Sequence, residues 1–308
     1  MSDLQATPVR AVAIGGGHGQ AATLRALRQV ASQITAIVSV ADDGGSSGRL
    51  RNELGILPPG DLRKCLVALA DQGSLLARAF ELRFDAGELT GHALGNLLLA
   101  ALVAESTDVQ EALDEAGRLL GAAGRVVPAS TVPVVLSAEL GDGPRAHRSI
   151  DPPAHDRRVE GQVAVMGAGA IRRVSFDPAD PPVPKPGLDA LGAADLVVLG
   201  PGSLYTSVIA AAAIPGVKAA IASSSGRRVY VCNLRPQDPE TGGYDVADHL
   251  AALVAHGIPV DAVLCDSTSI PLGDIPAGVE VVDLRLARPN GMAHDPARLA
   301  EALANLIG

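Results

Sequence analysis

The stretch Val9–Gly19, VRAVAIGGGHG, sets the expected fold of this 308-residue chain. Its first part, Val9–Ile14, is mostly apolar, which is typical of a parallel strand that is buried on both faces. Apolar residues then recur at roughly helical spacing over Gln20–Ala31, and a β-branched run, Ile34–Val40, follows. The pattern predicts a βαβ unit with a glycine-rich loop between its first strand and its helix.

The alternation of strand-like and helix-like segments continues along most of the chain and predicts an α/β fold on a mostly parallel sheet. Ala41–Gly60 is expected to be a loop, and Asp61 is expected to cap the helix that follows it. The other predicted helices are Leu62–Gln72, Leu75–Phe84, His92–Glu105, Asp108–Leu120, a segment ending near Ala213, Val246–His256 and Pro296–Ile307. The other predicted strands are Asp195–Leu199, Arg228–Asn233, Ala262–Asp266 and Val279–Asp283.

The middle of the chain, residues 126–186, differs from the flanking parts. Short β-like runs at Val132–Leu140, Gly161–Gly167 and Ile171–Phe176 alternate with Pro, Gly and charged turns. Pro178–Gly187, PADPPVPKPG, is expected to be a rigid connection. We interpret residues 126–186 as a β-rich insertion, antiparallel or mixed.

Composition excludes several classes of protein. The formal net charge of −9 argues against nucleic acid as the main partner, because phosphate neutralisation needs clustered Lys and Arg. The chain begins without a basic stretch followed by an apolar one, and it has no run of about 18 apolar residues, so neither a secretory signal nor a membrane span is expected. Cys65, Cys232 and Cys265 are far apart and form no CxxC pair, which favours a reducing, cytoplasmic location.

The first candidate site is the loop after the first strand: Gly15, Gly16, Gly17, His18 and Gly19. Glycines let the backbone approach a phosphate closely, and the helix N-terminus adds free N–H groups. Position 20 is Gln, so the dinucleotide fingerprint G-x-G-x-x-G is broken, and the loop is not a P-loop either. We favour phosphate binding over a simple tight turn.

The second candidate site is the acidic loop after the second strand, Asp42–Arg49. Asp42 could accept ribose hydroxyls, as one acid does in a dinucleotide fold. Asp42 and Asp43 together could instead hold Mg²⁺ against a diphosphate, although adjacent strand residues point in different directions. The remaining alternative is a solvated loop with a capping Asp.

The third candidate site is the loop Gly200–Ser207, which again lies between a strand and a helix. Two such strand ends in one parallel sheet predict a ligand crevice at a topological switch point. Tyr205 could stack on a base or sugar, or pack half-buried. Ser203, Thr206 and Ser207 could donate to phosphate or cap the helix, the Asn233 amide could read a base or ribose, and His92 and Asn96 lie one helical turn apart.

Five long stretches of the chain resemble the gluconeogenesis factor (YvcK/GlmR-like) family, within the CofD-like superfamily. They are Ala13–Gly19, Ile34–Ala70, Gly91–Leu102, Asp195–Ile209 and Val229–Leu250. His18 and the short length are similar to the actinobacterial branch. The resemblance implies one Rossmann-like domain over residues 1–308, often dimeric, with helices on both faces of the sheet.

The resemblance also implies a function and its site. CofD transfers 2-phospho-L-lactate from a guanosine diphosphate carrier with a metal ion, whereas YvcK-like proteins resemble UDP-sugar-binding regulators. The latter link carbon metabolism and gluconeogenic growth to peptidoglycan precursor synthesis and cell shape, partly through glucosamine-6-phosphate synthase. Gln20 and Ala293, which precedes His294, depart from the usual family pattern.

Two function classes follow, a nucleotide-sugar regulator without turnover and a CofD-like transferase of phosphorus-containing groups. A UDP-sugar, such as UDP-N-acetylglucosamine, is the expected ligand, a homodimer is the expected assembly, and Mg²⁺ is the only cofactor considered, with neither flavin nor haem expected. The implied ligand residues are Gly15, Gly16, Gly17, His18, Gly19, Asp42, Ser46, Ser47, Asn96, Gly200, Pro201, Gly202, Ser203, Tyr205 and Asn233, and the implied metal ligands are Asp42 and Asp43.

Overall fold

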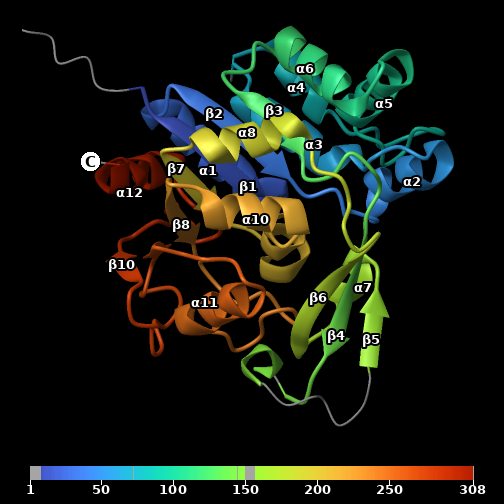
Figure 1. Cartoon of the computed structure of the whole chain (residues 1–308). Coiled ribbons are helices and arrows are strands. Elements are labelled where there is room, and N and C mark those ends of the chain that lie inside the picture. The colour runs from blue at the N-terminus through green and yellow to red at the C-terminus, as the bar shows by residue number, and fades with distance from the viewer. Residues whose placement is uncertain (1–7, 72, 144, 150–156, 308) are drawn as a thin grey trace, which may run out of the picture.

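A seven-stranded parallel sheet forms the centre of the molecule in the computed structural model, which describes residues 8–71, 73–143, 145–149 and 157–307 (Figure 1). The strand order is β10-β9-β8-β7-β1-β2-β3, and every neighbouring pair is parallel. The predicted α/β fold with a mostly parallel sheet is therefore confirmed. The strands are β1 (Arg10–Gly15), β2 (Gln33–Val38), β3 (Arg125–Pro128), β7 (Leu196–Leu199), β8 (Arg227–Val231), β9 (Ala262–Cys265) and β10 (Glu280–Asp283).

The strand order creates a switch point between β1 and β7. From β1 the chain moves outward to β2 and β3, and it later returns to β7, on the other side of β1, before moving outward to β10. Ala11 of β1 pairs with Ile34 of β2 on one side and with Leu196 of β7 on the other. In open parallel sheets, ligands bind beyond the carboxyl ends of the strands at such a point.

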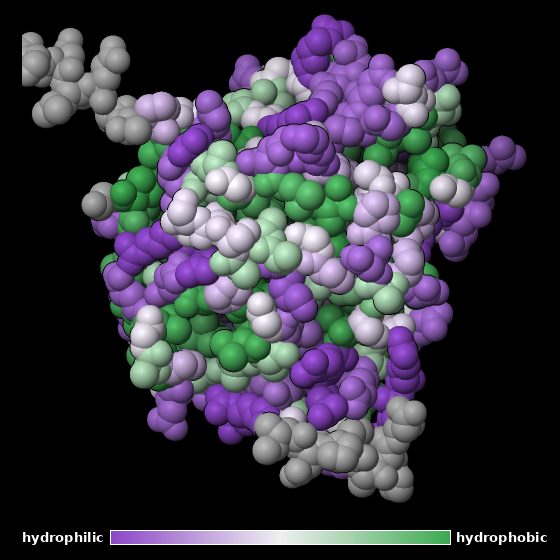
Figure 2. Space-filling model, in the orientation of Figure 1, coloured by the Kyte–Doolittle hydropathy of each residue, from purple (hydrophilic) through white to green (hydrophobic). Residues whose placement is uncertain are grey.

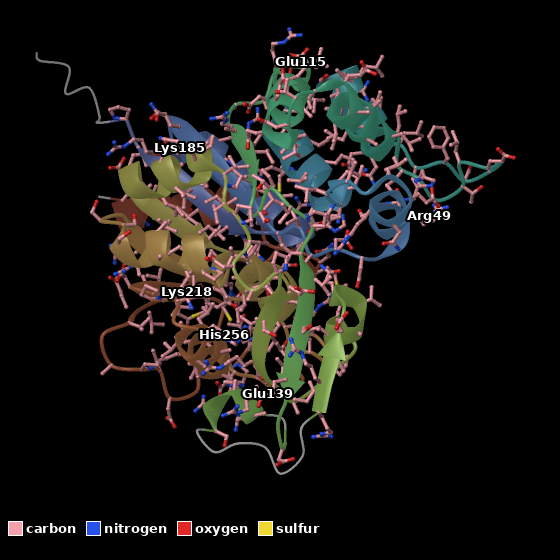
Figure 3. All side chains as sticks on the ribbon, turned by 45° about the vertical axis from the view of Figure 1, so that its right-hand side comes forward. Arg49, Glu115, Glu139, Lys185, Lys218 and His256 are labelled. Atoms are coloured by element: carbon pink, nitrogen blue, oxygen red, sulfur yellow. The ribbon has the colours of Figure 1, made fainter. Side chains whose placement is uncertain are left out.

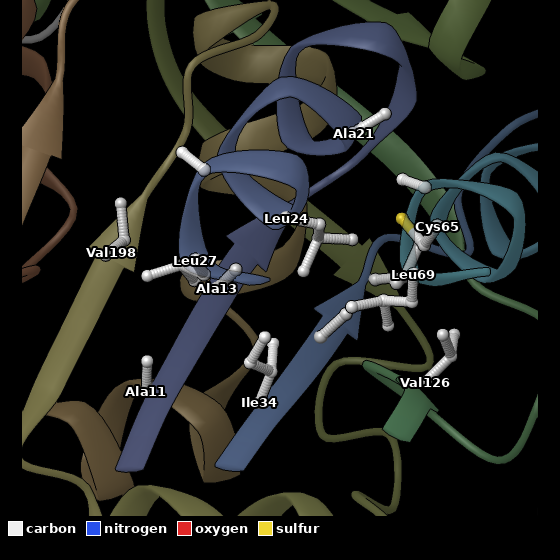
Figure 4. Packing of buried hydrophobic residues seen from close by; sticks show 14 of the residues in the cluster. Ala11, Ala13, Ala21, Leu24, Leu27, Ile34, Cys65, Leu69, Val126 and Val198 are labelled. Atoms are coloured by element: carbon white, nitrogen blue, oxygen red, sulfur yellow. The ribbon is translucent and has the colours of Figure 1, made fainter. Parts of the chain in front are cut away.

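Helices cover both faces of this sheet, as Figure 1 shows. Successive strand residues point to opposite faces, so Ala11 and Ala13 enter one core cluster and Val12 and Ile14 the other. In Figure 4, Leu24 of α1 (Gly17–Val30) lies over the β1 and β2 strands. The first face carries α1, α3 (Pro59–Leu69) and α12 (Pro296–Ile307), and the second carries α8 (Lys185–Ala193), η2 (Leu204–Ile209), α9 (Ala210–Ala212), α10 (Pro215–Ser223) and α11 (Val246–Ala255).

A smaller antiparallel sheet confirms the β-rich insertion but changes its extent. Its order is β5-β4-β6, with β4 (Val135–Leu140), β5 (Arg157–Glu160) and β6 (Ile171–Asp177). His256, labelled in Figure 3, follows α11 and accepts the N–H of Val174 in β6 at 3.0 Å, which ties the small sheet to the main body.

Two predictions for the insertion are wrong. Residues 126–128 were assigned to the insertion but belong to β3, which pairs with β2 in the main sheet, and the β-like run at Gly161–Gly167 is the helix α7 (Gln162–Met166). Val165 of α7 is fully buried against the second core cluster, so tertiary packing outweighs the β propensity of a valine-rich run. The small sheet proper covers Val135–Asp177, and η1 (Ala146–Arg148) lies within this stretch.

The loop predicted at Ala41–Gly60 is also wrong, because it contains α2 (Gly45–Leu54). Its first turn is Gly-Ser-Ser-Gly, which disfavours a helix. Packing compensates, since a Cβ on Gly48 would lie 2.0 Å from the Asp43 carbonyl oxygen. The helices α8 and α10 were not predicted either, whereas α4 (Leu75–Glu81), α5 (Leu94–Glu105) and α6 (Val109–Leu120) match their predictions to within a few residues.

Figure 2 shows hydrophilic side chains over the top of this view, where α6 lies, and apolar groups between the helices below it. Within the part of the chain that the structure describes, no single helix is long and apolar enough to cross a membrane. One pair of helices, Leu204–Ala212 and Pro215–Ser223, reaches that length and apolar composition only when both are counted together, and the two are bent by 72° relative to each other.

Candidate functional site

Two glycine-rich loops meet at the β1/β7 switch point. Gly15–Gly19 connects β1 to α1, and Gly200–Ser203 connects β7 to η2. The loops touch through their backbones, because a Cβ on Gly19 would lie 2.2 Å from the carbonyl oxygen of Pro201. The prediction that both loops line one cleft at the carboxyl edge of a single parallel sheet is confirmed.

The first turn of α1 is free of side-chain capping. Its N-cap is Gly16, no side chain accepts a hydrogen bond from the N-terminal N–H groups, and no acidic residue lies in the first turn. Gly17 has φ +68°, which residues with a Cβ rarely adopt. The hydroxyl of Thr23 donates to the carbonyl of Gly200 at 2.6 Å and holds the second loop against α1. The N–H groups of this turn are therefore donors that an anionic ligand could use.

Gln20, which breaks the dinucleotide fingerprint, has a structural role. Its amide nitrogen donates to the carbonyls of Ala13 in β1 and Ile37 in β2, both at 3.0 Å. Its amide oxygen accepts from the Cys65 thiol at 3.3 Å, and the side chain is fully buried. Gln20 thus joins two strand ends beneath the glycine loop and does not reach the cleft.

A cavity of about 190 Å³ lies where these loops meet. Asn233, after β8, fixes part of its wall, since its amide oxygen accepts from the Gly202 N–H and its amide nitrogen donates to Gln237, both at 3.1 Å. Of the residues predicted for the ligand, the cavity is lined by His18, Gly19, Pro201, Gly202 and Asn233. The lining residues that the sequence did not assign to the ligand are Ala22, Leu234, Arg235, Gln237, Met292, Ala293 and His294.

The two histidines of the cavity differ in their surroundings. His294 is buried, and its Nε2 donates to the Cys232 carbonyl at 3.1 Å, which leaves Nδ1 as an acceptor. Burial lowers the pKa of His294 to about 4, so its ring is neutral at neutral pH. His18 is exposed at the mouth, where partial burial, followed by the charge of Lys64, lowers its pKa.

The stacking role considered for Tyr205 is wrong. The ring is fully buried in the second core cluster. Its hydroxyl donates to the Ile171 carbonyl at 3.3 Å and lies 3.0 Å from the Tyr244 hydroxyl. The Tyr205 side chain therefore connects η2, which follows the second glycine loop, to strand β6 of the small sheet. Ser203, by contrast, is half-buried at the start of η2 and makes no side-chain capping bond.

Glu240 occupies the N-terminus of η2, where the sequence predicted a phosphate contact. One carboxylate oxygen accepts from the backbone N–H groups of Tyr205 and Thr206, both at 2.9 Å, and from the Thr206 hydroxyl at 3.2 Å. Burial raises the pKa of this carboxyl. Thr206 therefore cannot donate to a ligand, and no motif or spacing in the sequence indicated Glu240.

Asp42 and Asp43 have different hydrogen-bond partners. An oxygen of Asp43 accepts the N–H of Val163 at 3.0 Å, at the start of the insertion helix α7. Asp42 accepts the N–H of Gly44 at 3.0 Å. The two carboxylates bind different segments of the chain, and the Asp42–Asp43 metal pair stays a prediction.

Asp61 instead lies between Asp42 and the first glycine loop. A Cβ on Gly16 would lie 2.5 Å from Asp61 Oδ2, and a Cβ on Gly60 would lie 3.4 Å from Asp42 Oδ2. Burial, and then the charge of Asp61, raises the pKa of Asp42, while Lys64 pairs with Asp61 at 3.0 Å. Asp61 lies inside α3, whose N-cap is Pro58, so its expected capping role is wrong.

These carboxylates do not form a complete protein metal site. The described residues contain no group of three or more His, Cys, Asp or Glu that could hold an ion. Two carboxylates beside the first glycine loop nevertheless suit Mg²⁺, which binds proteins through one or two carboxylates and completes its shell with water and phosphate oxygens.

Ser46, Ser47 and Asn96 form a buried network beside Asp42. The Ser46 hydroxyl lies 3.0 Å from His92 Nδ1 and accepts from the Asn96 amide at 3.0 Å. Ser47 accepts the N–H of Gly60 at 3.0 Å. Ser46, Ser47 and Asn96 are each no more than 5% exposed, so they position the Asp42 loop and do not line the cavity.

Comparison with known proteins agrees with this architecture. The family model described as 2-phospho-L-lactate transferase CofD matches residues 11–290. A Mycobacterium tuberculosis relative is 44% identical over 310 residues, covering 95% of this chain and 88% of the relative. The gluconeogenesis factor of Bacillus subtilis is 42% identical over 263 residues, covering 83% of this chain and 78% of the relative.

A solved structure is similar over nearly its whole length. It is the crystal structure of a UPF0052 family member from Bacillus halodurans, at 2.60 Å resolution. Its TM-score is 0.86 at 37% sequence identity, and the match covers 97% of this chain and 99% of that chain.

Proposed function

The chain belongs to the gluconeogenesis factor family of CofD-like proteins, and from that premise we propose that it is a regulator that binds a UDP-sugar without turning it over. The ligand proposed is UDP-N-acetylglucosamine. The observation that carries the proposal is the contact between the Gly15–Gly19 and Gly200–Ser203 loops at the β1/β7 switch point. The partially positive N-terminus of α1 opens there onto a cavity whose lining includes the polar side chains of Asn233, Arg235 and Gln237.

The diphosphate is proposed to lie on the first turn of α1. The N–H groups of that turn have no side-chain cap, whereas the N-terminus of η2 already binds the Glu240 carboxylate. In the proposal a phosphate accepts from the N–H groups of Gly17–Gly19, because those of Tyr205 and Thr206 already donate to Glu240. This difference supports the proposal that the phosphates lie on the β1 side of the cleft.

The rest of the ligand is proposed to extend along the edge of the sheet. The cavity of about 190 Å³ is smaller than the roughly 300–1,000 Å³ of pockets that enclose a drug-sized ligand. Gln237 and the acceptor Nδ1 of His294 offer polar contacts on the β8 side. The aromatic rings of Tyr205, Tyr230 and Tyr244 are used inside the core, so the nucleotide is held by small and amide side chains.

In this proposal the bound state reports the supply of an aminosugar nucleotide. The protein would then link carbon metabolism and gluconeogenic growth to peptidoglycan precursor synthesis and cell shape, as a cytoplasmic homodimer. Glucosamine-6-phosphate synthase is the proposed protein partner.

Equilibrium dialysis combined with product analysis tests the proposal. The full chain is incubated with UDP-N-acetylglucosamine and Mg²⁺, and the bound nucleotide and any released UMP or UDP are quantified. We expect saturable binding with the nucleotide recovered intact. Steady release of UMP, or of a transferred phosphoryl group, would contradict a regulator without turnover.

The approach of Asp61 to Asp42 favours one alternative, a CofD-like metal-dependent transferase. Asp42 and Asp61 would hold the Mg²⁺, which supplies charge stabilisation to a phosphoryl group when bound. The side chains of the site would then bind and orient the diphosphate and exclude water. Turnover that disappears in Asp42→Asn would support this alternative.

A further inference from the structure

Arg235 lines the cavity and has no strong acceptor. It follows β8, its side chain is exposed, and Nη1 lies 3.1 Å from the thioether sulfur of Met292. A thioether is a weak acceptor, and a guanidinium carries five N–H donors. Arg228, near the start of β8, is in contrast paired with both carboxylate oxygens of Asp261.

Among the described residues that line the cavity, Arg235 is the one whose side chain is always positively charged. His294 is neutral at neutral pH because burial lowers its pKa to about 4, and burial also lowers the pKa of His18. The guanidinium stays charged at any physiological pH. In a chain with a net charge of −9, an unpaired arginine in a cleft provides a local site for an anion.

The same cavity is lined by a second group that could donate to an anion. Gly19, in the uncapped first turn of α1, lines the same cavity, whose volume is about 190 Å³. The contact of Arg235 with Met292 joins the loop after β8 to the loop before α12. A ligand with one phosphate can bind one of these two groups at a time. A ligand with two phosphates can bind both.

We infer that Arg235 binds the second phosphate of a diphosphate ligand whose first phosphate lies on the α1 N-terminus, and so selects diphosphates over monophosphates. The inference rests on the proposed nucleotide site and adds a reason for that site to prefer diphosphates to monophosphates. A guanidinium suits this role because it forms two parallel hydrogen bonds to phosphate oxygens.

Titration calorimetry of the full chain with UDP and UMP, at fixed Mg²⁺, tests the inference. Wild type is expected to bind UDP at least about tenfold more tightly than UMP. Arg235→Gln is expected to lose about tenfold or more in UDP affinity and to keep its UMP affinity within about threefold. Arg235→Lys should be intermediate, because a lysine keeps the charge but not the paired hydrogen bonds.

The matched control is Arg288→Gln. Arg288 is exposed on the loop that carries Met292 but is not one of the described residues that line the cavity. This variant should bind UDP and UMP as wild type does, and all variants should unfold at the wild-type temperature. An unchanged UDP affinity in Arg235→Gln would overturn the inference, as would an equal loss for UDP and UMP.

Inorganic pyrophosphate separates this inference from the proposed function. If no uridine nucleotide binds but pyrophosphate binds to wild type and not to Arg235→Gln, the nucleotide proposal fails and the arginine site stands. If neither pyrophosphate nor any nucleotide binds to wild type, both are overturned.

Discussion

The backbone of Gly19 lies directly against the backbone of Pro201, so that a Cβ on Gly19 would lie 2.2 Å from the Pro201 carbonyl oxygen. Gly19 lies in the first turn of α1 and Pro201 in the β7–η2 loop, 182 positions apart in the chain. This contact brings the two halves of the proposed nucleotide site together. It also makes the site sensitive to the addition of one methyl group.

Gly19→Ala is therefore expected to separate the two loops and abolish nucleotide binding. The contacted atom is backbone, so relief requires movement of a loop, at a cost on the order of 1–3 kcal/mol in the free energy of unfolding. Thermal unfolding and calorimetry on the same sample measure both effects.

The control for this substitution is Gly192→Ala in α8. A Cβ there meets no atom within 4 Å, and its backbone is helical. The control should be neutral or slightly stabilising and should keep the wild-type affinity. Wild-type binding by a folded Gly19→Ala variant would show that the loop contact is only structural.

Three single substitutions of aspartate by asparagine should distinguish the role of Asp42 and Asp61 from that of Asp43. Asp42→Asn and Asp61→Asn are each expected to remove any dependence of nucleotide affinity on Mg²⁺, because an amide is a weaker, uncharged ligand. Asp43→Asn should preserve it, since the Asp43 carboxylate serves Val163. Affinities measured with Mg²⁺ and with EDTA decide this, and a loss of Mg²⁺ dependence in Asp43→Asn alone would contradict the assignment.

Removal of the Glu240 carboxylate should destabilise the second loop. Glu240→Ala leaves two backbone N–H groups and the Thr206 hydroxyl without their acceptor, at about 1–3 kcal/mol for each unsatisfied group. Glu240→Gln keeps one acceptor oxygen and should lose much less stability. Urea unfolding of both variants measures the difference, and equal losses would argue against a hydrogen-bonding role for the carboxylate.

Stability is expected to fall as the pH decreases from about 6.5 to about 4. Burial lowers the pKa of His147, His249, His256 and His294 to about 4. In this window the unfolded chain binds protons that the folded chain does not, so each group removes up to about 1.4 kcal/mol of stability per pH unit.

His256 gives this pH dependence a specific contact. Its Nδ1 donates to the Ala252 carbonyl at 2.7 Å, so Nε2 must accept from Val174, and protonation would break that bond between α11 and β6. Urea unfolding at pH 7 and pH 5 should show a smaller stability loss in His256→Gln than in wild type. An identical loss in the variant would exclude a contribution from His256.

Local features made the first loop predictable from the sequence. The signals lie close together in the sequence: the apolar run Val9–Ile14, the glycines after it and the helical spacing from Gln20 onward. The structure has β1, the glycine loop and α1 at these positions. The meeting of the two loops followed from a general rule on strand ends, and it depended on β1 and β7 being neighbours.

The features that the sequence did not predict depend on contacts between distant segments. The helix α2 begins with poor helix formers and is held by packing against Asp43. Tyr205 and Glu240 are 35 residues apart, and their hydrogen bond has no periodic signature. Likewise, the divergence of Asp42 and Asp43 was expected from strand geometry, but the approach of Asp61 to Asp42 follows from the placement of α3.

Titration calorimetry of the purified full chain with UDP-N-acetylglucosamine, with and without Mg²⁺, tests the central claim most directly. The account predicts one saturable site per chain, displaced by UDP, absent in Gly19→Ala and retained in Gly192→Ala. A wild-type protein that is folded and yet gives no binding heat with UDP-N-acetylglucosamine, UDP, GDP or NAD would contradict it.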